Sequence, residues 1–262
     1  MLGNLKLNLP EAKPYKQNDI EIMLLGGGPS LSDFEDDIRE KRESGMPLVT
    51  TNGAYNWCLE RGINPSMQVV VDGRPFNKRF VQPHIKNCHY LIASQCSPEI
   101  TKAAPRDQVI LWHAGMSDSV KNSLEAHDHE RGEGRAWFPV MGGSSVMMRT
   151  IPMLIMLGYH LFHIYGWDSC LMGDKHHAYD QPENDGKSAI PVRVGGKEFK
   201  CQMWMWVQAR EFIDIQQMIA EHCDMAVYGS GLIAHIIETA AKESDNGRKC
   251  LSDVPQLEAV SG

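Results

Sequence analysis

The sequence has no excess of positive charge. Its 26 lysine and arginine residues are outnumbered by 33 aspartate and glutamate residues, which gives a formal net charge of −7. A mildly acidic surface does not attract phosphate backbones in general, so we expect no nucleic-acid partner. The 262 residues are 42% hydrophobic and 23% charged, which excludes a disordered or collagen-like chain and indicates an ordinary globular protein.

The seven cysteines lack the spacing of a metal site or of a disulfide framework. Their number is odd, and no pair has the C-x-x-C spacing. Reduced thiols in a cytoplasmic protein explain this pattern best. The histidines of the long polar segment near residue 176 also lack the H-x-x-x-H spacing of a zinc site. We therefore predict no metal site from spacing.

Long apolar runs and an N-terminal targeting signal are also missing. The longest uncharged run covers residues 150–167, has 18 residues and is interrupted by Pro152, Gly158, His160 and His163. A membrane-spanning helix needs about 20 predominantly apolar residues, so a buried helix followed by a buried strand explains the run better. The first six residues do not have the basic-then-apolar order of a secretory signal. No membrane span is expected.

Short apolar runs alternate with helix-length amphipathic stretches along the chain. Strands are predicted at residues 20–25, 47–51, 67–71, 90–93, 109–112, 160–165 and 225–228. Ser32 and Glu35 have the spacing of a capping box and predict a helix start after the first strand. The charged segment 125–135 is predicted to be a surface loop. The alternation predicts a Rossmann-like α/β fold: a mainly parallel sheet with helices on both faces.

We expect a single domain over residues 1–242 with a polar C-terminal tail at 243–262. The segment from 169 to 188, called the lid below, is rich in Asp, Gly, His, Asn and Pro, which is typical of a long functional loop. Gly195-Gly196 follows it and predicts a β-hairpin turn. The domain should therefore carry a lid and hairpin insertion at about 169–200.

Four loops at the predicted carboxyl ends of strands carry residues suited to a ligand site. They are 26–30, 51–52, 72–74 and 166–168. In an open parallel sheet these ends converge on the binding crevice. The first loop, Gly-Gly-Gly-Pro-Ser, allows close backbone approach to a nucleotide phosphate or ribose at a helix N-terminus. It is not the dinucleotide motif G-x-G-x-x-G, because Leu31 occupies the last glycine position, so NAD is disfavoured.

Three polar residues at these strand ends each have two interpretations. Asn52 could cap the following helix or contact a base or sugar. Asp72 could bind a metal ion or a sugar hydroxyl, or could simply pair with Arg74. Asp168 occupies the equivalent place after the sixth predicted strand, or serves as a turn carboxylate that accepts backbone N–H groups. The residues alone leave these alternatives open.

Further candidates lie in the lid and before a predicted helix. His176 and His177 could supply a general base near neutral pH, or could be solvated polar residues. Ser144 and Ser145 precede a helix and could hold a phosphate group, but they do not form a G-x-S-x-G nucleophile motif. Trp204 is expected to serve in packing.

Taken in order, these segments resemble the 6-hydroxymethylpterin diphosphokinase MptE-like family, which includes the core domain of bacterial motility accessory factors. The matching segments are L-L-G-G-G-P-S-L at 24–31, T-N-G at 51–53 through G-I-N-P at 62–65, V-V-V-D at 69–72, G-G-S-S-V at 142–146, and I-Y-G-W-D at 164–168 followed by H-A-Y at 177–179. The layout is also similar to bacterial CMP-sialic acid sialyltransferases. In those enzymes a G-x-G-P-S-L loop and an asparagine hold CMP, and a lid histidine acts as base.

The resemblance implies a nucleotide-dependent transferase, with a glycosyltransferase that uses a CMP-activated sugar as the leading interpretation. The resemblance assigns nucleotide binding to the glycine loop and Asn52, and with the candidates named above the predicted nucleotide-binding residues are Gly26, Gly27, Gly28, Ser30, Asn52, Asp72, Ser144 and Ser145. It assigns the general base to His177, whose His-Ala pair matches the family, with His176 beside it and Asp168 orienting the site. The expected partners are the activated donor and an acceptor hydroxyl, with the oligomeric state left open.

Two other functions stay open at this point. A diphosphokinase would transfer pyrophosphate from ATP to a hydroxymethylpterin-like substrate, with Asp72 and Asp168 holding magnesium between the phosphates. A non-enzymatic nucleotide-binding or interaction module would need neither a base nor a metal. Because the sequence carries none of the flanking domains of motility accessory factors, flagellin is not the expected acceptor.

Overall fold

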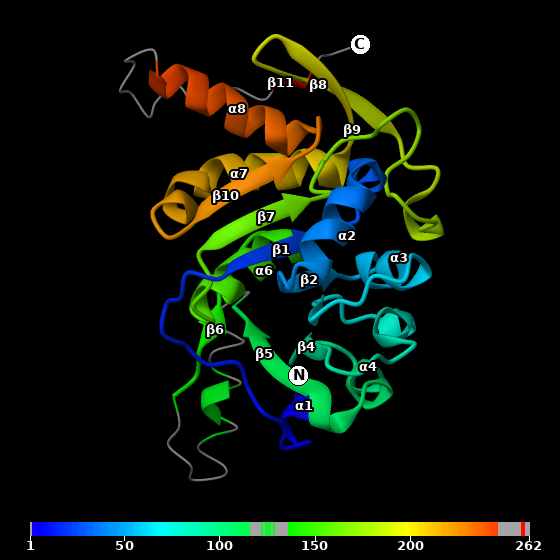
Figure 1. Cartoon of the computed structure of the whole chain (residues 1–262), viewed down its shortest axis with the longest axis vertical. Helices are drawn as coiled ribbons and strands as arrows, with labels where there is room; N and C mark the ends of the chain where they lie inside the picture. The colour runs from blue at the N-terminus through cyan, green and yellow to red at the C-terminus, as the bar shows by residue number, and fades with distance from the viewer. Residues whose placement is uncertain are drawn as a thin grey trace.

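A computed structural model describes residues 2–115, 122, 124–126, 128, 136–245 and 258–259 of the chain. Its centre is an eight-stranded sheet in the order β10-β7-β1-β2-β3-β4-β5-β6, in which every neighbouring pair is parallel. The strands are β1 Glu21–Leu25, β2 Leu48–Thr51, β3 Met67–Val70, β4 His89–Ala93, β5 Val109–Ala114, β6 Pro139–Val140, β7 Leu161–Tyr165 and β10 Asp224–Tyr228. Figure 1 shows these strands stacked from β10 near the top to β5 below.

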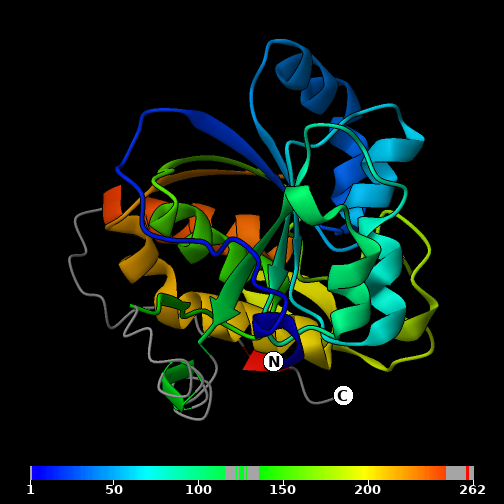
Figure 2. The same cartoon turned by 90° about the horizontal axis from the view of Figure 1, so that it is seen from below.

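Helices cover both faces of this sheet, as Figure 2 shows. The helical segments are α1 Leu2–Leu5, η1 Pro29–Phe34, α2 Glu35–Glu43, α3 Ala54–Glu60, η2 Pro75–Val81, α4 Pro98–Ala103, η3 Arg106–Gln108, α6 Val146–Met156, η4 Pro182–Asn184, α7 Met203–Ala220 and α8 Leu232–Asp245. Side chains alternate along β1: Ile22 and Leu24 join the core that includes α6, α7 and α8, whereas Met23 and Leu25 join the core of α2 and α3. Burial on both faces explains why the strands are continuous apolar runs.

The order of the strands reverses between β1 and β7. The chain proceeds outward from β1 to β6 and then returns, so that β7 lies beside β1. The register aligns Leu25 with Tyr165, and the glycine that follows each strand therefore leaves the sheet at the same edge. Such a switch point is where open α/β sheets bind their ligands.

The predicted Rossmann-like α/β class is confirmed, and so are the predicted strands and hairpin. The hairpin consists of β8 Ala189–Val194 and β9 Lys197–Gln202, and both glycines of its turn have positive φ, at 51° and 79°. Within the predicted tail, α8 continues to Asp245 and β11 Glu258–Ala259 pairs with β8. The short strand β6 was missed because two residues carry no periodic pattern. The segment 125–135 lies mostly outside the described residues.

The predicted capping box is wrong. The first helical turn begins at Pro29 as η1, and α2 follows from Glu35 with no side-chain cap. Glu35 instead forms ion pairs with Arg39, at 2.9 Å, and with Arg61, at 3.0 Å. The helix starts early because proline favours the first helical position, so Ser32 already lies inside the turn.

Among the described residues, no helix has the length and apolar character needed to cross a membrane. The six cysteines in this part of the chain are all buried and free.

Candidate active site

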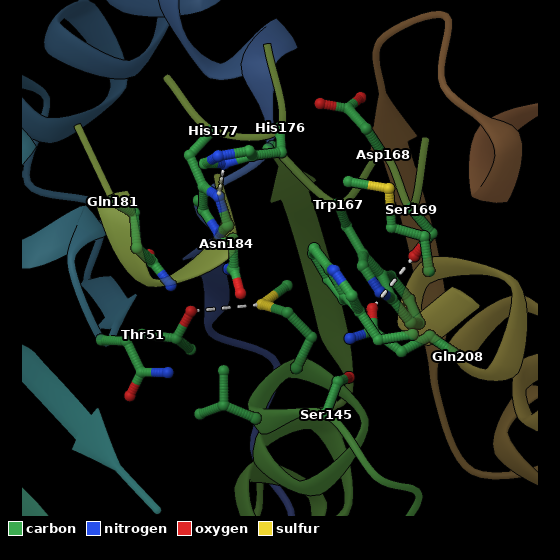
Figure 3. A pocket seen from close by; sticks show the side chains of 18 of the residues that line it. Thr51, Ser145, Trp167, Asp168, Ser169, His176, His177, Gln181, Asn184 and Gln208 are labelled. Atoms are coloured by element: carbon green, nitrogen blue, oxygen red, sulfur yellow. Dashed lines mark hydrogen bonds between the residues drawn. The ribbon is translucent and has the colours of Figure 1, made fainter. Parts of the chain in front are cut away.

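A cleft of about 500 Å³ opens at the carboxyl ends of β1, β2, β3 and β7. Its walls come from the glycine loop after β1, the N-terminal part of α6, the lid and the first turns of α7. Figure 3 shows Ser145 next to α6, His176 and His177 of the lid and Gln208 of α7 around it. Of the predicted site residues, the cleft is lined by Gly27, Gly28, Asn52, Asp72, Ser144, Ser145, Asp168, His176 and His177. Gly26 and Ser30 do not line it. The sequence-based prediction of one shared cleft therefore agrees with the structure for nine of the eleven residues.

The glycines after β1 allow other parts of the protein to pack closely. Gly28 donates its N–H to the carbonyl of Gly166 at 2.7 Å, and a Cβ at Gly28 would lie 2.7 Å from that same oxygen. A Cβ at Gly27 would lie 2.9 Å from Cδ2 of His177 and closer still to the Tyr179 hydroxyl. The loop is therefore glycine-rich because β7 and the lid approach its backbone.

Asp168 is an anchor for this loop. Its side chain is 2% exposed, and its two oxygens accept from the Ser30 N–H at 2.9 Å and the Ser30 hydroxyl at 2.7 Å. Burial raises the pKa of Asp168, and the hydrogen bonds from Ser30 oppose that rise. In Figure 3 its carboxylate points away from the centre of the pocket. The carboxylate thus takes the place at the start of η1 that a bound phosphate would otherwise occupy, and the N–H groups of Gly28 and Ser30 are already engaged.

Asn52 does not cap α3, because Gly53 holds the N-cap position. Its backbone is in the left-handed region at φ 47°, which asparagine tolerates better than most residues. The backbone is held on both sides, by the carbonyl of Val69 at 3.1 Å and by the side-chain amide of Gln68 at 2.9 Å. Its side-chain oxygen Oδ1 is buried and has no hydrogen-bond partner in the described structure. The carboxamide is therefore positioned at the cleft with unused hydrogen-bonding capacity.

Asp72 forms an ion pair with Arg74, which is the second of the two interpretations that the sequence left open. Its carboxylate pairs with Arg74, whose Nε lies 3.0 and 2.9 Å from the two oxygens and whose Nη2 makes a further short contact. Burial alone would raise the pKa of Asp72, but the hydrogen bonds and charge of Arg74 outweigh it, so the pKa lies below its usual range.

The two lid histidines form a hydrogen-bonded chain that ends on a carboxylate. Nδ1 of His176 lies 2.7 Å from Nδ1 of His177, and Nε2 of His176 lies 2.8 Å from Oδ1 of Asp185. An ionised carboxylate only accepts, so His176 donates from Nε2, and with both rings neutral its Nδ1 must accept from Nδ1 of His177. Nε2 of His177 is then the unprotonated nitrogen. This tautomer follows from the hydrogen-bond network.

Burial and the adjacent His176 lower the pKa of His177 to about 4. The ring is therefore neutral at physiological pH. It stacks on Trp204, with ring centroids 6.0 Å apart and planes inclined by 20°. The next residue, Ala178, donates its N–H to the carbonyl of Gly27 at 3.0 Å. The glycine loop and α7 thus hold the base candidate from both sides.

Ser144 and Ser145 both form hydrogen bonds within the protein. The N–H and the hydroxyl of Ser144 both donate to Oε2 of Glu211, each at 2.7 Å. Ser145 is the N-cap of α6, where its hydroxyl accepts from the N–H of Met148 at 3.3 Å. Both donors of Ser144 are therefore engaged by Glu211, whereas the cap uses only an acceptor lone pair of the Ser145 hydroxyl.

Sequence reasoning missed several residues that line the cleft. They are Arg149 on α6, Gln181, Asn184 and Lys187 of the lid, and Gln208 on α7. Arg149 had a usable signal, because it is a single charge in the otherwise apolar stretch 146–157. Trp204, predicted to serve in packing, does contact the core but also lines the cleft. The lid residues carried no signal beyond the polarity of their loop.

An open parallel sheet with its cleft at the switch point defines a Rossmann-like α/β protein. The family model described as 6-hydroxymethylpterin diphosphokinase MptE-like matches residues 1–174, and the chain belongs to that family. The resemblance inferred from the motifs is thereby confirmed. The matched segment includes the glycine loop and Asp168 and ends just before the two lid histidines.

Among solved structures, the chain is similar to the MAf glycosyltransferase from Magnetospirillum magneticum AMB-1, with a TM-score of 0.64 and 12% sequence identity. The alignment covers 96% of this chain and 40% of that one, so the chain spans well under half the length of the glycosyltransferase. At this identity the likeness shows a common fold. No curated protein matches the chain.

Proposed function

We propose that the chain is a glycosyltransferase that moves a sugar from a CMP-activated donor to an acceptor hydroxyl, with His177 as general base. The observation that carries the proposal is the hydrogen-bonded chain Asp185–His176–His177, which leaves Nε2 of His177 unprotonated at the cleft. Family membership and the fold shared with a MAf glycosyltransferase support transferase chemistry.

In the proposed reaction, Nε2 of His177 takes the proton of the acceptor hydroxyl as its oxygen attacks the anomeric carbon. The bond between that carbon and the phosphate oxygen breaks, and its electron pair leaves with CMP. The charge that develops on His177 lies at the end of a hydrogen-bonded chain whose far end is the Asp185 carboxylate. That carboxylate favours the charged form of the pair during the transfer.

The nucleoside part of the donor would be bound by Asn52. Its buried, unpaired Oδ1 can accept from an exocyclic amine or a ribose hydroxyl, and its side-chain NH₂ can donate. A buried polar atom without a partner is costly, so a ligand that pairs with it gains the corresponding free energy.

The residues present do not fit the magnesium site of a diphosphokinase. Asp72 is paired with Arg74, and Asp168 is bound by Ser30. Across the described residues, no group of three or more His, Cys, Asp or Glu side chains could hold a metal ion. The two carboxylates assigned to magnesium thus serve protein contacts, which favours sugar transfer over pyrophosphate transfer.

The test combines nucleotide binding with one substitution. Calorimetry with CMP, CDP, ATP, UDP and NAD should show preference for CMP, and His177→Ala should lower the transfer rate by about 100-fold or more while EDTA has little effect. His89→Ala, an exposed histidine at the start of β4, is the matched control and should retain full activity. ATP preference with loss of activity on chelation and a normal His177→Ala rate would overturn the proposal. Absence of binding to every nucleotide would favour an interaction module.

A further inference from the structure

Arg149 is a buried cation for which the described structure supplies no partner. It lies on α6, one turn after Ser145, lines the cleft and is only 6% exposed. Its Nη1 is buried without a hydrogen bond, and no described residue forms a hydrogen bond or ion pair with its guanidinium. Burial lowers the pKa of Arg149 and the nearby Glu211 carboxylate counteracts this, but an arginine keeps its charge in proteins.

The other cations of the cleft differ from Arg149 because they have partners. Arg74 is paired with Asp72, and Lys187 donates to Oδ1 of Asn184 at 2.8 Å. Glu211, the acidic neighbour of Arg149, accepts both hydrogen bonds from Ser144. An unpaired buried charge costs several kcal/mol, which an apolar side chain at this position would avoid. The position is therefore suited to an oxyanion that enters the cleft.

We propose that Arg149 binds the phosphate of the nucleotide in the cleft; this inference rests on the proposed function. The planar guanidinium presents paired N–H donors that match two phosphate oxygens. It takes the role that sequence reasoning assigned to Ser144 and Ser145; the N–H and hydroxyl of Ser144 donate to Glu211, and the hydroxyl oxygen of Ser145 caps α6. As the bond to the sugar breaks, negative charge grows on the leaving phosphate, and the fixed guanidinium stabilises it.

A CMP-activated sugar acid contains a second oxyanion, its carboxylate, so the probes must separate the two groups. CMP has the phosphate and no carboxylate, and cytidine has neither. We would measure binding of CMP, cytidine and inorganic phosphate to wild type, Arg149→Met and Arg149→Lys by calorimetry. Arg193→Met is the matched control, because Arg193 lies on the hairpin outside the cleft and its loss changes the net charge equally.

Arg149→Met should weaken CMP binding by about tenfold or more and leave cytidine binding unchanged, since only the charge-assisted contact to phosphate is lost. Arg149→Lys should recover part of the affinity, and Arg193→Met should match wild type. Without ligand, the melting temperature of Arg149→Met should equal or exceed that of wild type, because an unpaired buried charge is replaced by an apolar side chain. A purely structural role of Arg149 predicts a lower melting temperature instead.

The possible failures of the two proposals are distinguishable. Equal affinity of Arg149→Met and wild type for CMP would overturn the role of Arg149 while leaving CMP as the nucleotide. An equal loss of CMP and cytidine binding would also overturn it, because the substitution would then have disturbed the cleft as a whole. Binding of inorganic phosphate that depends on Arg149, without binding of CMP, would support the phosphate site and overturn the CMP donor.

Discussion

The pH dependence of folding stability tests the burial of His177 without requiring a substrate. The pKa of His177 is lowered from 6.5 to about 4 by burial and by His176; Glu183 opposes this slightly, and Lys187 lowers the pKa a little further. Between these two values the unfolded chain binds a proton that the native state does not bind. Stability must therefore decrease as the pH falls through this window.

The size of the effect follows from the two pKa values. At about pH 7 the histidine is neutral in both states and contributes almost nothing, whereas at about pH 4.5 its unfavourable contribution is about 2.5 kcal/mol. His177→Gln keeps a polar side chain but removes the titration. Relative to wild type, this variant should gain about 2 kcal/mol of unfolding free energy between pH 7 and pH 4.5.

Urea unfolding of both proteins at several pH values between about 7 and 4.5 measures this difference directly. Groups that do not contact residue 177 contribute equally to both curves, so their contributions cancel in the difference. His89→Gln, at an exposed position, is the control and should follow the wild-type curve. Parallel curves for wild type and His177→Gln would refute the reasoning, because they would show that His177 titrates alike in the folded and unfolded chains.

Two predictions concern the contacts behind the cleft. Gly28→Ala should cost about 1–3 kcal/mol of stability in urea unfolding, because its Cβ would lie 2.7 Å from the carbonyl oxygen of Gly166. The control is Gly196→Ala, whose Cβ would meet no atom within 4 Å. This substitution should cost only about 1 kcal/mol of stability, because residue 196 has a positive φ. Equal losses of stability in the two variants would contradict the close packing at Gly28. Asp168→Ala should cost about 1–3 kcal/mol because it leaves the buried N–H and hydroxyl of Ser30 without their acceptor. Asp168→Asn keeps one carbonyl acceptor and should lose less, and if the two variants are equally stable the anchoring role is wrong.

The position of Asp168 alters the interpretation of the glycine loop. A glycine-rich turn before a helix commonly receives a phosphate, but here a carboxylate of the same protein occupies the start of η1. The loop therefore joins β1 to β7 and the lid, and the groups that we propose to bind the ligand are Asn52, His177 and Arg149, which line the same cleft. This arrangement explains why the phosphate contact is inferred for a side chain of α6.

The amino-acid sequence by itself determined the architecture and the edge of the sheet at which the cleft lies. Continuous apolar runs separated by amphipathic stretches are a local property of the chain, and they predict a parallel sheet covered on both faces. Polar and glycine residues directly after those runs must gather at one edge of such a sheet. Gly27, Gly28, Asn52, Asp72 and Asp168, which follow predicted strands, accordingly line one cleft.

Only the tertiary structure decided which of those residues have free hydrogen-bonding groups. Ser30 and Asp168 are 138 positions apart, and Ser144 and Glu211 are 67 apart, so their pairing depends on the order of the strands and the packing of α7. The tautomer of His177 depends in turn on Asp185, which reaches His176 across the lid. The guanidinium of Arg149 lacks a hydrogen-bond partner in the described structure, and its acidic neighbour Glu211 accepts from Ser144 instead. Such pairings arise from three-dimensional proximity, which residue types and local spacing do not encode.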